Sequence, residues 1–255
     1  MRKSLLALTA LAATAALPAQ AEYHYGFANV YGDYLNWEQG AEEVNRPAHY
    51  TIGAEGGAGF DWGEIYGFYE YEKLNMASTD RSQAAKFSMH YKIVGDFTAY
   101  AQVYNIIDNK FSSEQNRVFG FGYTGLTGDN FWFKPFAGMH DVSAGDYTET
   151  DKDGKVTTRI DANGFNGYMV GWNAGFKFDV AGVPLMVTNW HETELARNEG
   201  YAASQHGKTG HNGAVGLWFD ITDTFYTGVQ YRYFYNKLGY EGYGDAMIWR
   251  IGMHL

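Results

Sequence analysis

The sequence predicts an all-β protein, a twelve-stranded antiparallel transmembrane β-barrel of the bacterial outer membrane. Three observations support this fold class: an export signal, runs of alternating apolar and polar residues, and long polar connections that alternate with short ones. The runs are about eight to twelve residues long, which is the length of a tilted membrane-spanning strand. After residue 21 no stretch of eighteen consecutive apolar residues occurs, so a helical membrane protein is excluded.

The first 21 residues predict a secretory signal peptide that is cleaved on export. Arg2 and Lys3 form a basic start, and residues 5–17 are an apolar run too short to span a bilayer. Ala19-Gln20-Ala21 then supplies a cleavage site with small residues. We therefore expect a single barrel domain over residues 22–255.

Charge and composition narrow the class further. The formal net charge is −10, and loss of Arg2 and Lys3 makes it more negative, so binding to nucleic acid through basic patches is excluded. The chain has no cysteine, which excludes disulfides and thiolate-bound metals. Aromatic residues make up 18% of the chain, and there are 32 Gly but only 4 Pro, a composition that favours an envelope β protein. The mean hydropathy of −0.38 agrees with a barrel, because only alternate residues face lipid.

The last eleven residues show the alternation most clearly. One face of this stretch carries Met247, Trp249, Ile251, Met253 and Leu255, and the other carries Ala246, Ile248, Arg250, Gly252 and His254. The same period of two recurs in residues 50–60, 87–93, 168–178, 215–219 and 225–236. We expect the C-terminal strand to close the barrel against the first strand, with its apolar face toward lipid and Arg250 toward the lumen.

The connections divide the chain into twelve strands. Short links rich in Gly, Asp, Asn and Thr lie near residues 60–63, 94–96, 125–130, 179–182 and 220–224. Longer polar connections lie near residues 36–49, 74–84, 106–116, 140–163, 193–209 and 237–244. This alternation is typical of outer-membrane barrels, in which long loops face outside while short turns and both termini face the periplasm.

Polar and aromatic residues at alternate positions predict the lining of the barrel lumen. The predicted lumen residues are Glu64, Tyr66, Phe68, Glu70, Lys86, His90, Lys92, Tyr100, Tyr104, Arg117, Arg232 and Arg250. Facing acidic and basic residues would create a transverse field that suits neutral dipolar solutes. Mutual neutralisation in a wet lumen is the better explanation for any single residue, whereas the set as a whole favours a functional polar lining. Inward aromatic rings could stack on a planar solute, whereas outward ones are explained by the girdles at the membrane interfaces.

Two segments resemble a known family. Residues 50–62 followed by 64–71 resemble the second and third strands of Tsx-type nucleoside channels and their OmpK relatives. Residues 125–136, Gly-Leu-Thr-Gly-Asp-Asn-Phe-Trp-Phe-Lys-Pro-Phe, are similar to that family's turn and following strand. The resemblance implies a twelve-stranded outer-membrane channel with a narrow lumen that passes nucleosides or similar small solutes. Some members of the family also serve as phage receptors. Leu255 departs from the family's usual terminal Phe.

Two other functions stay open on the sequence. One is a surface receptor or adhesin with a plugged lumen, for which phage would be a partner. The other is a lipid-modifying barrel enzyme, which needs a hydroxyl beside an oriented histidine. His206 and His211 lie near Ser204 and Thr209, but without a recognisable catalytic pattern. His191 with Glu192 and Glu194 does not form a closed set of metal ligands.

The sequence therefore predicts a channel without catalysis, metal or cofactor. The expected partners are nucleosides or similar solutes, outer-membrane lipid and lipopolysaccharide, and the machinery that assembles outer-membrane barrels. The protein is expected to be a monomer.

Overall fold

The computed structural model describes residues 21–40, 46–109 and 113–255. The predicted signal peptide lies outside these residues except for Ala21. Within the described ranges, no helix is both long and apolar enough to cross a membrane.

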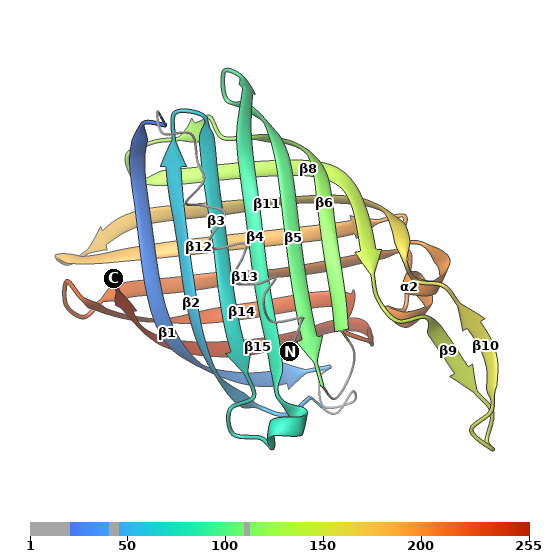
Figure 1. Ribbon diagram of the computed structural model, residues 1–255. Coiled ribbons are helices and arrows are strands. Elements are labelled where there is room, and N and C mark those ends of the chain that lie inside the picture. Colours follow the sequence, from blue (N-terminus) through green and yellow to red (C-terminus); the bar gives the residue numbers. More distant parts are fainter. Residues whose placement is uncertain (1–20, 41–45, 110–112) are drawn as a thin grey trace.

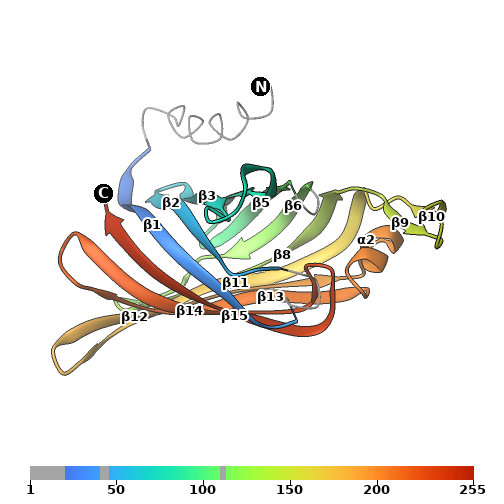
Figure 2. The same ribbon diagram turned by 90° about the horizontal axis from the view of Figure 1, so that it is seen from below.

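Twelve long antiparallel strands form one closed barrel (Figures 1 and 2). They are β1 (Tyr23–Gln39), β2 (His49–Phe60), β3 (Gly63–Glu72), β4 (Ser82–Val94), β5 (Phe97–Asp108), β6 (Ser113–Tyr123), β8 (Phe131–Ser143), β11 (Gly164–Val180), β12 (Val183–Leu195), β13 (Thr209–Asp220), β14 (Phe225–Lys237) and β15 (Tyr240–His254). Each strand pairs with the next of this series, and pairing of β15 with β1 closes the sheet. The predicted fold is confirmed.

The closing strand has the two faces that its sequence predicts. Trp249 and Ile251 are 45% and 61% exposed toward the outside, whereas Ala246 and Ile248 are buried. Opposite Cα partners run from Asn29↔His254 to Trp37↔Ala246, so most of β15 pairs with β1. A closed sheet leaves no unpaired backbone edge in the membrane, which is the requirement that makes barrels stable there.

Three glycines of β2 make room for aromatic rings of β1. A Cβ atom at Gly53, Gly57 or Gly59 would lie less than 3.0 Å from an atom of a ring. The rings belong to Tyr31, Phe27 and Tyr25, respectively. The strand therefore has small residues on its inward face so that the neighbouring strand can lay large rings across it.

The two ends of the barrel differ. One end carries both described termini and short turns, such as residues 61–62, 95–96 and 181–182. The other end carries the longer connections, which include the 3₁₀ helix η2 (Ser78–Asp80), the hairpin of β9 (Tyr147–Thr150) and β10 (Val156–Ile160), and the helix α2 (Glu199–Ser204). The short strand β7 (Leu126–Thr127) lies in the turn before β8. Figure 1 shows the β9–β10 hairpin projecting away from the barrel, while α2 stays close to it.

One predicted loop is wrong. The sequence predicts a long connection over residues 237–244, but Lys237 pairs with Tyr240, and only Leu238 and Gly239 form the turn. Both turn residues have positive φ, 63° and 76°, as the tight turns of β-hairpins require. The polar residues that follow belong to β15, because polar side chains on strand ends at a membrane surface are solvated and need no loop.

Candidate solute-binding lumen

Arg250 on β15 is the centre of a dense charged cluster inside the barrel. Its guanidinium donates two hydrogen bonds of 2.8 Å to the two carboxylate oxygens of Asp33 on β1 and one of 3.2 Å to Glu55 on β2. It also lies 3.4 Å from the ring centroid of Tyr31, whose hydroxyl donates to Glu70 at 2.9 Å. Bidentate pairing of this kind fixes the plane of the guanidinium, so Arg250 is held rigidly against the wall.

A second ion pair crosses the bore. The Nζ atom of Lys86 on β4 lies 2.7 Å from Oε1 of Glu192 on β12. Strands β5, β6, β8 and β11 separate these two strands on one side, and a longer series separates them on the other. Gln102 on β5 donates to the same carboxylate at 2.8 Å, and Tyr100 donates to Gln102 at 2.6 Å. The pair therefore narrows the lumen at this level.

A third group of charges lies nearer the end with the termini. Lys134 on β8 forms an ion pair and hydrogen bond with Glu64 on β3. Tyr25 on β1 donates to Glu64 at 2.6 Å, and Lys134 lies 3.3 Å from the Tyr25 hydroxyl. Three strands far apart in the sequence thus meet here through side chains that point into the lumen.

Aromatic rings on β1, β3 and β5 form a continuous row, which we call the aromatic ladder. It consists of Phe27, Tyr66, Phe68 and Tyr104, with successive ring centroids 6.3, 6.4 and 6.5 Å apart. The Tyr66 hydroxyl donates to Glu55 at 2.9 Å, which joins the ladder to the Arg250 cluster. Phe27 is 47% exposed, so part of the ladder is open to the solvent in the bore.

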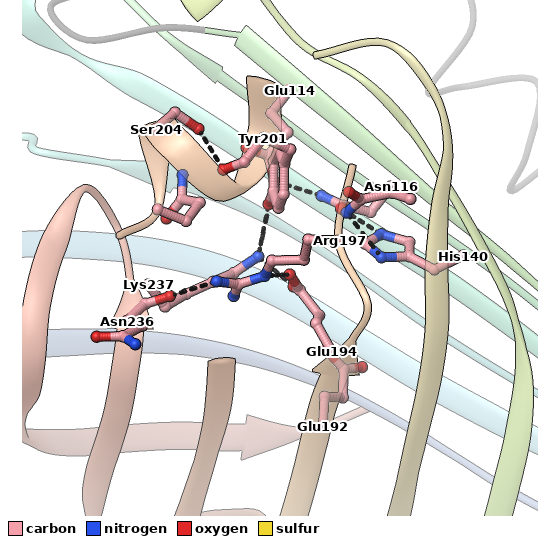
Figure 3. Close-up of polar contacts among 12 residues, drawn as sticks. Glu114, Asn116, His140, Glu192, Glu194, Arg197, Tyr201, Ser204, Asn236 and Lys237 are labelled. Atoms are coloured by element: carbon pink, nitrogen blue, oxygen red, sulfur yellow. Dashed lines mark hydrogen bonds and ion pairs between the residues drawn. The ribbon is translucent and has the colours of Figure 1, made fainter. Parts of the chain in front are cut away.

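At the end with the long loops, side chains of α2 and the chain beside it contact residues of β6, β12 and β14 (Figure 3). Tyr201 donates to Glu114 on β6 at 2.8 Å and accepts from Lys237 on β14 at 2.7 Å. Glu194 on β12 pairs with Lys237 and, at 2.7 Å, with Arg197. Burial raises the pKa of Tyr201 well above its usual range, helped by the nearby carboxylate of Glu114, so the phenol stays protonated and remains a donor.

Residues 32–254 match the family described as nucleoside-specific channel-forming protein, Tsx. The chain belongs to this family. It is also similar in fold to a solved structure of the NanC porin, with 13% sequence identity, a TM-score of 0.51, and coverage of 89% of this chain and 98% of that one. A structure of the outer-membrane channel DcaP of Acinetobacter baumannii matches with 10% identity and a TM-score of 0.44 over 93% of this chain and 98% of that one.

This Tsx-family protein is an outer-membrane channel, and most predicted lumen residues face its bore. The inward residues are Glu64, Tyr66, Phe68, Glu70, Lys86, His90, Tyr100, Tyr104, Arg232 and Arg250, as their contacts or the alternation of their strands show. His90 is only 7% exposed and makes a 2.8 Å hydrogen bond with Thr98. Arg232 lies over the ring of Trp37 at 5.7 Å. Lys92 shares the face of His90 but is exposed near the turn that ends β4.

Arg117 does not line the channel, so this prediction is wrong. Its neighbours Asn116 and Val118 are 4% and 0% exposed and face inward, whereas Phe119 is 52% exposed on the outer face. Arg117 therefore points outward, where it pairs with Asp141 of β8. The error arose because Arg117 was assigned inward for its charge, although the alternation of β6 groups it with Phe119. At the loop end of a strand an outward arginine can reach the polar interface.

Several lumen charges were not predicted. They are Asp33, Glu55, Lys134, Glu192 and Glu194. Glu194 was missed because β12 was predicted to end near Thr193, whereas it extends to Leu195. The alternation of β12 places Glu194 on the same inward face as Glu192, which lies within the predicted strand. It also separates them from His191, which lies on the outward face of β12.

The histidines that the sequence singled out lie at two separate places. His211 and His191 each lie 2.9 Å from the Thr193 hydroxyl on the outward face of the barrel. His206 instead lies 3.2 Å from the carbonyl oxygen of Gly239. In the part of the chain that the structure describes, no group of three or more His, Cys, Asp or Glu side chains is placed to hold a metal ion.

Proposed function

We propose that this channel passes nucleosides and similar small polar solutes by facilitated diffusion. The proposal rests mainly on one observation, the aromatic ladder lying beside fixed carboxylates in a narrow bore. A nucleoside has a flat base that stacks on rings and ribose hydroxyls that bond to carboxylates. The family description, nucleoside-specific channel-forming protein, supports the same class of solute.

The charges favour a neutral solute over a phosphorylated one. Arg250 is already paired with Asp33 and Glu55, and Lys86 with Glu192. To bind Arg250 or Lys86, a phosphate would have to displace a carboxylate and would meet the remaining carboxylates at short range. A neutral nucleoside can instead exchange hydrogen bonds with the pairs one at a time, without separating charges.

Weak binding is sufficient for transport, because a solute has to leave each site that it enters. The ladder offers successive ring faces at similar spacing, so a base can move from one ring to the next without losing all its contacts. We propose that this transport involves no catalysis and no cofactor, that the channel acts as a monomer, and that residues 1–21 are removed after export. Mass spectrometry of the mature protein tests the cleavage.

The experiment is a planar-bilayer measurement with the refolded mature protein. Adenosine should block the ion current, and adenosine monophosphate should block it less. Phe68→Ala removes a ring of the ladder, and loss of one base stack of about 1–3 kcal/mol should raise the half-blocking concentration roughly fivefold or more. Phe121→Ala is the matched control, because Phe121 is 69% exposed on the outer face.

The half-blocking concentration of adenosine should be the same for Phe121→Ala as for the unaltered channel. Conductance that no nucleoside blocks would reject the nucleoside proposal. Equal half-blocking concentrations for Phe68→Ala and the unaltered channel would reject the role of the ladder.

A further inference from the structure

The connection between β12 and β13, residues 196–208, folds into the loop end of the barrel. Tyr201 of α2 and Arg197 before it are each 1% exposed. Tyr201 packs with Val142 at the end of β8 and with Ala162 in an apolar cluster. A surface loop would be solvated, so burial of this degree marks a segment that is part of the barrel interior. We call residues 196–208 the mouth loop.

The mouth loop is tied to widely separated walls. Tyr201 bonds to Glu114 of β6 and to Lys237 of β14, as Figure 3 shows. Strands β8, β11, β12 and β13 lie between β6 and β14 on one side, and β15 and β1–β5 lie between them on the other. A single side chain therefore joins two nearly opposite parts of the wall and occupies the space between them.

The base of the loop is equally well held. Asn198 caps α2 by accepting a 2.8 Å hydrogen bond from the backbone of Tyr201. The backbone N–H of Asn198 donates to Asn166 of β11 at 2.8 Å, and Asn166 contacts His140 of β8 at 3.2 Å. The guanidinium of Arg197 donates to the carbonyl oxygen of Asn236 at 2.8 Å. The loop is therefore bound to four strands rather than hinged at its two ends.

The charges of this cluster balance one another. Glu114 and Glu194 face Arg197 and Lys237, and the four side chains are mostly buried. Paired and buried charges project little field into the bore beyond them. The mouth loop consequently restricts passage by its bulk, and the cluster adds no net charge.

From this geometry we propose that the mouth loop is a fixed filter that sets the largest solute entering from the outside. The cluster of Glu194, Arg197, Tyr201 and Lys237 holds it in place. The inference rests on the channel function but not on nucleosides as the solute, so neutral polymers can test it.

The hairpin geometry provides a clean deletion. Leu195 pairs directly with Thr209, so a two-residue Asn-Gly turn can replace residues 196–208 and still connect β12 to β13. The deletion also removes the positive charge of Arg197. The substitution Glu194→Gln is therefore added, so that the remaining charges of Glu114 and Lys237 cancel. The control is a trimmed β9–β10 hairpin, in which an Asn-Gly turn joins Tyr147 to Ile160, which are paired in the structure.

The measurement combines single-channel conductance with partition of polyethylene glycols of graded mass. Deletion of the mouth loop should raise the conductance at least twofold and allow larger polymers to enter the bore. The reversal potential in a salt gradient should change little. The trimmed hairpin should leave all three unchanged. An unchanged size limit after deletion would overturn the proposal, as would an equal increase in the control.

A second variant protects the test against failure of the deletion to fold. Tyr201→Ala keeps the whole loop and removes only the side chain that joins β6 and β14. It should raise the size limit by a smaller amount than the deletion. If Tyr201→Ala barrels fold and show the original size limit and conductance, the bridging role is wrong.

Discussion

Removal of the Lys86 charge should make the channel prefer cations. Lys86 neutralises Glu192 across the bore at 2.7 Å, and their side chains are 18% and 15% exposed, so both are reached by water in the lumen. Lys86→Met keeps most of the side-chain length. The carboxylate of Glu192 then keeps only the neutral amide of Gln102 as a hydrogen-bond donor. The bore then contains one uncompensated negative charge at its narrow level.

The size of the effect follows from the distance to a permeating ion. At ~5 Å the interaction energy between a unit charge and a monovalent ion is about 1 kcal/mol in water and about 3 kcal/mol at an effective dielectric constant of ~20. Even the lower value favours a cation roughly fivefold and disfavours an anion by a similar factor, so the ratio of cation to anion permeability should rise at least fivefold. The reversal potential across a potassium chloride gradient in planar bilayers measures this ratio.

The double variant Lys86→Met/Glu192→Gln is the matched control. It removes both charges of the pair, so the permeability ratio should return close to that of the unaltered channel. An unchanged reversal potential in Lys86→Met would refute the placement of this pair at the narrow part of the bore. A double variant that stays as cation-selective as the single one would show that Glu192 is not the charge responsible.

Three further predictions concern the wall of the barrel, each measured by urea unfolding in lipid vesicles. Asp33→Asn leaves the buried guanidinium of Arg250 without its bidentate partner and should cost about 3 kcal/mol, whereas a loss below ~1 kcal/mol would contradict a tight cluster. Gly53→Leu should cost about 1–3 kcal/mol, because its Cβ would lie 2.5 Å from the ring of Tyr31, and equal stability would show that this ring moves freely. Val215→Arg, on an outward face that is 42% exposed, should cost about 2–4 kcal/mol near the bilayer centre, while Val215→Leu should be neutral.

The fold could be predicted from the sequence because the signal is local. A strand with one face in lipid and one in water alternates every second residue, and this held for Trp249 and Ile251 on the outside and Arg250 on the inside. The prediction failed where a residue was placed by its chemistry instead of its position. Arg117 is charged, yet alternation puts it with Phe119 on the outer face.

Strand ends were also less predictable than strand centres. Polar side chains occur both in loops and in the parts of strands that emerge from the membrane, so polarity does not mark the boundary. Residues 240–244 of β15 and Glu194 of β12 were assigned to loops for this reason. The consequence was that Glu194, which lies at the loop end of the bore, was not recognised from the sequence.

By itself, the sequence determined where most strands lie and which face of each meets lipid, because both depend on neighbours one or two positions away. Only the tertiary structure decided which charges meet. Lys86 and Glu192 are 106 positions apart, and Arg250 and Asp33 are 217 apart. Their contacts depend on the curvature of the closed sheet and on the stagger between strands, which the period-two pattern does not specify. The position of the mouth loop likewise depends on partners from the four strands β6, β11, β12 and β14.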